Sequence, residues 1–202
     1  MAPRGFNKDE AQRIEEQLVK VGKDKFETIG LKKTSIRDLT EEVGISLGSF
    51  YKFFDSKELL YFRILEQEEE AIQAELIREF ESIAQMNAAH FASVLLKAFK
   101  LIEQRPILYR IIVTDDYEVL VRKLPSEVIH AHAEQDTLNF SPLFQYWQEQ
   151  GIMDRSLSHE VISGSLRAIF LLLTHQKEIG EDVFNDSFQF MIHAIAEKIF
   201  KE

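Results

Sequence analysis

Hydrophobic positions recur at helical spacing along nearly the whole chain. In its first long stretch, five apolar residues share one helical face and are separated by charged residues: Ile14, Leu18, Val21, Phe26 and Ile29. Asn7 is placed as the N-cap of this helix with Glu10 at its third position, and Gly30 ends it. Alternating runs bounded by turn residues, which would indicate strands, are almost absent. The pattern therefore predicts an all-α protein.

A pair of short helices joined by a glycine turn is predicted next. Ser35 and Asp38 form a capping box at the start of the first helix. Gly44 stands where a helix ends in a left-handed residue, and Ser46 follows as the N-cap of the next helix. Two helices with this connection form a helix-turn-helix arrangement.

The second helix of the pair is expected to span Ser46–Phe53 and to turn Phe50 and Phe54 toward a core. Gly48 lowers its helix propensity by roughly 1 kcal/mol relative to alanine, which indicates that another backbone approaches there. The remaining surface carries small polar groups, one phenol and one lysine, and such a surface suits the DNA major groove. A third helix begins near Ser56, where free N–H groups and Lys57 are candidates to hold a phosphate.

Further helices are predicted along the rest of the chain. A long one runs from Ser56 to about Ala84, and its acidic cluster of Glu66, Glu68, Glu69 and Glu70 is interpreted as a solvated face. Asn87 and Pro106 open two more helices, Asp115, Asp116 and Pro125 interrupt the pattern, and another helix covers about Ser126 to Gln150.

The last two predicted helices are apolar over an unusually broad part of their circumference. The segment Val161–Leu173 is apolar nearly all round, and a second apolar stripe follows Gly180. Such helices are buried on more than one side. A single small domain would bury this surface only with a partner.

Composition limits the class of protein. The 202-residue chain has 45% apolar residues and no cysteine, which indicates a soluble helical protein and excludes a disulfide scaffold or a thiolate zinc site. No signal peptide and no apolar run of membrane-spanning length is visible, and a cytoplasmic location is expected.

Charge is distributed unevenly along the chain. The formal net charge is −10, yet residues 1–60 hold 11 basic and 11 acidic residues, so the whole excess of acid lies beyond them. A DNA-binding domain of this kind is neutral and must use locally clustered cations: Arg4, Lys8, Lys32, Lys33, Arg37, Lys52 and Lys57. Binding is then expected to depend strongly on salt.

Catalytic and metal-binding motifs receive no support. The six histidines lack the spacing of metal ligands, and no nucleophile elbow, P-loop or dinucleotide fingerprint is present. The sequence therefore predicts no enzyme, no metal and no cofactor.

The region from about Asn7 to Leu60 resembles the DNA-binding domain of TetR-type (TetR/AcrR family) bacterial transcriptional regulators. The resemblance rests on the joint order of Thr34, Ile36–Leu39, Glu42–Ser46, Gly48–Tyr51, Phe54 and Ser56–Leu60. Leu47 departs from it, because lysine is frequent at this position in the family. The departure bears on the operator sequence and not on DNA binding itself.

The resemblance implies a domain organisation and two partners. Residues 1–55 would form a three-helix helix-turn-helix domain, and residues 56–202 a helical ligand-binding and dimerisation domain. The expected DNA contacts are Thr34, Ser35, Arg37, Ser46, Leu47, Gly48, Ser49, Tyr51, Lys52 and Lys57. A symmetric four-helix interface between two copies would use Ser165, Ile169, Leu172, Phe188, Ile192 and Ile195.

The function expected from these features is a homodimeric repressor that a small, mostly apolar effector releases from a palindromic DNA operator. The aromatic residues expected to line the effector cavity, if they are not simply core, are Phe99, Tyr109, Phe144, Trp147 and Phe170. An activator, a helix-turn-helix module that binds another protein, and an enzyme using the helical cavity are the alternatives. The effector, the operator sequence and the regulated genes are not determined by the sequence.

Overall fold

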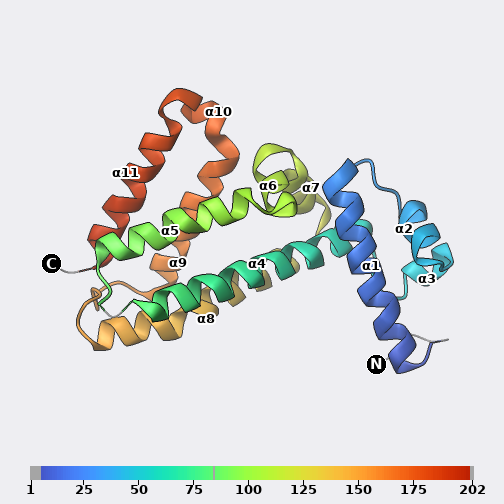
Figure 1. Cartoon of the computed structure of the whole chain (residues 1–202), viewed down its shortest axis with the longest axis horizontal. Coiled ribbons are helices and arrows are strands. Elements are labelled where there is room, and N and C mark those ends of the chain that lie inside the picture. Colours follow the sequence, from blue (N-terminus) through green and yellow to red (C-terminus); the bar gives the residue numbers. More distant parts are fainter. Residues whose placement is uncertain (1–5, 84, 201–202) are drawn as a thin grey trace. The chain divides into compact units, whose positions relative to one another are not determined.

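The computed structural model describes residues 6–83 and 85–200, and for Ala133 and residues 136–139 it describes the backbone alone. Helices make up most of these residues, and the described part contains no strand, only an isolated bridge between Met153 and Phe200. The all-α prediction is confirmed. Figure 1 shows the helices in chain order: α1 (Lys8–Ile29), α2 (Ile36–Val43), α3 (Leu47–Phe50), α4 (Lys57–Ser82), α5 (Ala88–Glu103), α6 (Pro106–Val113), α7 (Asp116–Lys123), α8 (Ser126–Glu149), α9 (His159–Leu172), the 3₁₀ turn η1 (Leu173–His175), α10 (Gln176–Ile179) and α11 (Glu181–Ile199).

These helices form two compact units that interleave along the chain. The first unit contains the chain up to Glu70 and Arg105–Pro125, and the second contains Ala71–Gln104 and the chain from Ser126 onward. Helix α4 therefore begins in the first unit and ends in the second, and α6 and α7 belong to the first unit. The sequence-based division at residues 55 and 56 is a simple sequential one and differs from this interleaving.

The core of the first unit is built by α1, α2, the start of α4 and α6. Leu18, Phe26, Leu39, Phe50 and Tyr61 are completely buried there, and each such large side chain contributes roughly 1.5–3 kcal/mol by leaving water. The rings of Phe26 and Tyr61 meet edge to face with centroids 5.0 Å apart. Burial of these residues fixes α1 against α4 and α2 against α1.

The second unit has an aromatic core. Trp147 of α8 contacts Phe80 of α4, Phe91 of α5 and Phe200, with ring centroids 5.3, 6.1 and 5.6 Å away. Helix α11 packs along α5 and also contacts α9. Large aromatic side chains thus join α8 and the end of the chain to the consecutive helices α4 and α5.

Helix boundaries follow local signals, with three differences from the prediction. Regular helix in α3 ends at Phe50, and residues 51–53 continue as a turn. Where Asp115 and Pro125 were expected to interrupt the helical pattern, the structure contains the short helix α7. Its acidic first turn and basic last turn complement the helix dipole. Short helical segments, η1 and α10, connect α9 to α11.

Candidate DNA-binding surface and regulatory contacts

The helix-turn-helix pair is held by local hydrogen bonds. Ser35 Oγ accepts from the Asp38 backbone N–H at 3.1 Å, and the Asp38 carboxylate accepts from the Ser35 backbone N–H at 2.9 Å. The hydrogen bond from the Ser35 hydroxyl, followed by the one from its backbone N–H, lowers the pKa of Asp38. Gly44 adopts the left-handed conformation, with φ 78° and ψ 31°, and ends α2. The capping box and glycine turn expected from the sequence are confirmed.

The polar surface of the second helix is exposed. Ser46 caps α3 by accepting from the Ser49 backbone N–H at 3.2 Å. Phe50 is buried, whereas Leu47 and Tyr51 are each about half exposed. No described atom outside the local backbone lies within 4 Å of the position that a Cβ would occupy at Gly48. The described protein backbone therefore does not supply the close approach predicted at Gly48.

Several cations near this surface are engaged by acidic neighbours. Arg37 Nε lies 3.5 Å from Glu41, Lys25 lies 2.7 Å from Glu42, and Lys32 pairs with Asp115. The Arg37 and Lys32 side chains are more than half exposed, so their pairs are weak and available for exchange with phosphate. Arg4, another predicted cation, lies outside the described residues.

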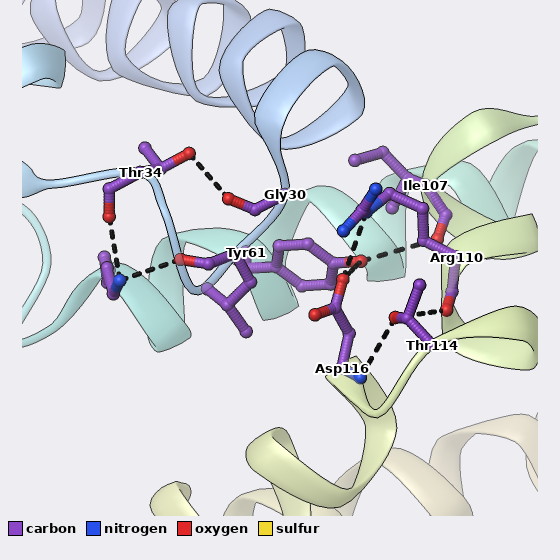
Figure 2. Close-up of polar contacts among 9 residues, drawn as sticks. Gly30, Thr34, Tyr61, Ile107, Arg110, Thr114 and Asp116 are labelled. Atoms are coloured by element: carbon purple, nitrogen blue, oxygen red, sulfur yellow. Dashed lines mark hydrogen bonds and ion pairs between the residues drawn. The ribbon is translucent and has the colours of Figure 1, made fainter.

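Two residues predicted to contact DNA, Thr34 and Lys57, have side chains that form hydrogen bonds with carbonyl groups of the protein. Thr34 is buried, and its hydroxyl donates to the Gly30 carbonyl at 2.8 Å. Lys57 Nζ donates to the carbonyls of Leu31 at 2.7 Å and Thr34 at 2.8 Å, and approaches that of Lys32 at 3.3 Å. Lys57 therefore fixes the turn between α1 and α2 from the start of α4. Figure 2 shows the hydrogen bond that Thr34 donates to the Gly30 carbonyl. Direct contact of Thr34 and Lys57 with DNA stays a prediction.

A buried polar cluster lies in the same unit beside this turn (Figure 2). Asp116 is 2% exposed, accepts from Arg110 Nε at 3.1 Å and lies 3.4 Å from the Tyr61 hydroxyl. Burial raises the pKa of Tyr61, and the neighbouring Asp116 charge raises it further, so the phenol stays neutral. The Arg110 guanidinium packs so closely on Gly30 that a Cβ there would lie 2.1 Å from Nη2. The cluster joins α4, α6 and α7 to the end of α1.

A second ionic contact within the first unit links α4 to α1 and to the start of α6. Glu68 of α4 pairs with Lys23 of α1 at 2.5 Å and with Arg105, at the start of α6, at 3.0 Å. Burial opposes the charged form of Glu68, but hydrogen bonds from Lys23 and Arg105 prevail and lower its pKa. The prediction of a purely solvated acidic face is wrong at this residue, because the sequence did not show that α1 and α6 bring cations to it.

The aromatic residues predicted to line an effector cavity are divided between the two units. Tyr109 belongs to the first unit and is exposed, whereas the other four belong to the second. Phe99 packs edge to face on Phe188 at 4.3 Å, and Phe144 is buried beside Trp147. Of the five residues, Trp147 alone lines an open hollow of about 950 Å³ bordered by α4, α8 and the segment between α4 and α5. The cavity assignment stays a prediction.

The residues predicted for a dimer interface differ in exposure. Ile169, Phe188 and Ile192 are buried within the chain, whereas Ser165, Leu172 and Ile195 are partly exposed. Other apolar side chains of these helices are exposed: Val161, Ala168 and Leu171 of α9, and Val183, Phe190 and Ala194 of α11. We call these six residues the α9–α11 surface. The broad apolar pattern of the last two helices indicated that apolar residues would remain exposed on a single chain, but the sequence could not show which residues face outward.

Other described features bear on chemistry and location. In the part of the chain that the structure describes, no cluster of three or more His, Asp or Glu side chains is arranged to hold a metal ion. None of the described helices combines the length and apolar composition that a membrane crossing requires.

Comparison with known proteins agrees with the geometry of the first unit. Residues 18–64 match the family model of bacterial regulatory proteins of the tetR family. This match covers α2, α3, the part of α1 from Leu18 onward and the start of α4. No curated protein matches the sequence.

Solved structures resemble the chain over nearly its whole length. A TetR-family transcriptional regulator from Pectobacterium atrosepticum is 20% identical, with 94% of each chain covered and a TM-score of 0.68. SmeT, the repressor of the Stenotrophomonas maltophilia multidrug efflux pump SmeDEF, is 14% identical, with 93% of this chain and 91% of that chain covered and a TM-score of 0.63. RolR in complex with its ligand resorcinol is 17% identical, with coverages of 95% and 96% and a TM-score of 0.59. At these identities the resemblance establishes the fold.

Proposed function

Because the chain carries a TetR-type DNA-binding domain on the helical fold of TetR-family regulators, we propose that it is a dimeric transcriptional repressor that a small effector releases from DNA. The observation that carries the proposal is the exposed surface of α3 and its flanking residues, on which Ser46, Tyr51 and Lys52 are exposed while Phe50 is buried beneath them. Its place of action is then the cytoplasm, and no catalytic step is needed.

DNA would be read by Ser46–Phe53, the reading segment, which contains α3 and the turn that follows it. Its exposed residues Leu47, Gly48, Tyr51 and Lys52 would approach base edges, with Ser46 and Ser49 beside them. Ser35 and Arg37 would position the domain on phosphates. Thr34 and Lys57 would contribute chiefly by shaping the turn before α2, because their polar atoms are held by protein carbonyls.

A mobility-shift titration with DNA from beside the protein's own gene, repeated across a salt series, tests this function. Tyr51→Ala and Lys52→Ala should each weaken specific binding by about 1–3 kcal/mol if they reach base edges. Lys177→Ala, an exposed position on α10, is the matched control and should bind normally. Folded Tyr51 and Lys52 variants with full affinity would contradict the assignment.

Dimerisation would pair the α9–α11 surfaces of two copies. Its residues recur at helical spacing on one face of each helix, and Phe190 is 74% exposed. A twofold axis through this surface would present two reading segments to a palindromic operator with half-sites ~34–36 Å, or a multiple of this, apart. The partly exposed Ser165, Leu172 and Ile195 would lie at its edges, and the buried Ile169, Phe188 and Ile192 would support it from within.

Effector control would act through the chain segments that connect the two units. Helix α4 passes between them at Glu70 and Ala71, and the α6–α7 segment is joined to the second unit at both of its ends. The contacts of Glu68 and Asp116 hold α4 and α6 to α1, so strain on either segment would reach the helix-turn-helix. An effector works only if its affinity differs between the DNA-competent and DNA-incompetent states.

Reciprocity provides the test of effector control. Small molecules found by thermal shift would be titrated with and without operator DNA, and a true effector should bind more weakly to the DNA complex. A coupling of ~1–3 kcal/mol is typical, and operator affinity must fall by the same factor when the effector is saturating. Equal affinity in both titrations would exclude that molecule as an inducer.

A further inference from the structure

Phe6 connects the start of α1 to the end of the reading segment. Its ring centroid lies 5.6 Å from that of Phe53, with the planes inclined by 44°. The Lys52 ammonium lies 5.1 Å from the centre of the same Phe6 ring. A residue that precedes the first helix therefore contacts two neighbouring side chains of the DNA-reading surface.

The backbone that carries Phe6 is anchored on its C-terminal side. Asn7 caps α1, with its side chain accepting from the Glu10 N–H at 2.8 Å and its carbonyl accepting from the Ala11 N–H at 2.9 Å. These two bonds set the direction in which the chain enters α1. The Phe6 ring also lines an open hollow of about 460 Å³ that Ser46 and Ser49 border. Phe6 thus contacts the end of the reading segment and borders the same hollow as its start.

The reading segment needs such support because its regular helix is only one turn long. Helix α3 contains four residues, and a single turn is not stable by itself. Phe50 and Phe54 hold the segment from the core, but Lys52 extends outward on a flexible stem. The face of an aromatic ring attracts an ammonium group and restricts where it lies.

We propose that Phe6 is a positioning residue for DNA recognition. Its ring holds Lys52 and the turn at Phe53 in the orientation in which Lys52 meets the operator. The inference rests on the proposed DNA-binding function, and it extends the functional surface to a residue outside the helix-turn-helix and outside the matched residues 18–64.

The contact can be measured without DNA by NMR of the intact protein. The ε-methylene resonance of Lys52, identified by its loss in Lys52→Gln, should be shifted upfield by the Phe6 ring current. Phe6→Leu should abolish this shift, and Phe6→Trp should keep it. A Lys52 resonance that is the same in wild type and Phe6→Leu would overturn the inference whatever the DNA results.

A double-mutant cycle on operator binding tests the consequence. Phe6→Leu should weaken operator affinity about two- to fivefold, as expected for loss of an exposed cation–π contact, while Phe6→Trp stays near wild type. In the Lys52→Gln background, Phe6→Leu should have no further effect. An equal loss in both backgrounds would show that Phe6 acts by general packing and would overturn its role in positioning Lys52.

The two measurements separate failure of this inference from failure of the proposed function. A wild-type chain that binds no DNA at any salt concentration would overturn the proposed function and, with it, the recognition role of Phe6. A chain that binds operator but lacks the ring-current shift would overturn the inference alone. Thermal unfolding of each variant identifies any loss of affinity that comes from loss of folding.

Discussion

At the scale of single residues, the ion pair of Arg110 and Asp116 should be important for the stability of the first unit. Asp116 is 2% exposed, so Arg110→Ala would leave a buried carboxylate without its cation. We expect a loss of about 3 kcal/mol, at the low end for buried pairs because Arg110 is a quarter exposed. Urea denaturation measures it.

The matched control is Lys20→Ala, at an exposed position on α1. Surface substitutions of this kind usually change stability by less than about 0.5 kcal/mol. If both variants lost the same stability, the Arg110–Asp116 pair would have no special role in holding α6 and α7 to the unit.

Gly48 separates DNA binding from folding at a single position. A Cβ there meets no described atom within 4 Å, so Gly48→Ala should keep or raise stability, by up to about 1 kcal/mol from helix propensity. Operator affinity should nevertheless fall, because the added methyl group would stand on the surface proposed to approach base edges. Thermal unfolding and a mobility shift on the same variant measure both effects.

Gly30→Ala provides the contrasting case. Gly30 has φ 84° and ψ 165°, a region that glycine alone adopts readily, and its Cβ position overlaps the Arg110 guanidinium. We expect a loss on the order of 1–3 kcal/mol from the backbone alone. A Gly48→Ala variant that kept its stability and its full operator affinity would refute the proposed role of Gly48.

At the scale of elements, the start of α2 should respond to pH through Asp38. Its lowered pKa means that its charged form stabilises the folded state at pH values above its unfolded pKa of about 3.9. This stabilisation is lost as pH falls through the lowered folded pKa. The difference in Tm between wild type and Asp38→Asn should therefore be present at pH 7 and shrink below about pH 4.

The capping residue supplies a control for that measurement. In the Ser35→Ala background the Asp38 carboxylate loses its hydroxyl donor, so the pH dependence assigned to Asp38 should be smaller. A difference between wild type and Asp38→Asn that stayed constant from pH 7 to about pH 3 would contradict the role of the Asp38 charge in the capping box.

At the scale of the whole molecule, dimerisation should depend on exposed and not on buried residues of α11. Phe190→Glu should give folded monomers, because Phe190 is 74% exposed and a charge there opposes burial between two copies. Ile192→Glu should unfold or aggregate, because Ile192 is completely buried in the chain. Sedimentation velocity with circular dichroism distinguishes the two, and a wild-type chain monomeric at micromolar concentration would refute the dimer.

Loss of the dimer should also weaken operator binding, since two linked reading segments act on one palindrome. Folded Phe190→Glu monomers are therefore expected to need far more protein for a mobility shift than wild type. Normal operator affinity in a monomeric variant would show that a single reading segment suffices.

The local signals in the sequence determined most helix ends and the helix-turn-helix itself. The caps at Asn7, Ser35, Ser46 and Asn87 act through hydrogen bonds to a backbone group three residues away. The donor and the acceptor of each cap are therefore close together in the sequence. The left-handed turn at Gly44 likewise depends on one residue. Such features need no knowledge of tertiary structure.

Tertiary structure alone decided which side chains remain available for function. Lys57 binds carbonyls 23 to 26 residues earlier, and the Tyr61 hydroxyl approaches Asp116 across 55 residues. Periodicity likewise marked α9 and α11 as apolar, but only packing of α11 against α5 and α9 separated buried Ile192 from exposed Phe190. Helical periodicity identifies the apolar face of a helix. Whether that face is buried depends on helices that pack against it in space but lie far away in the sequence.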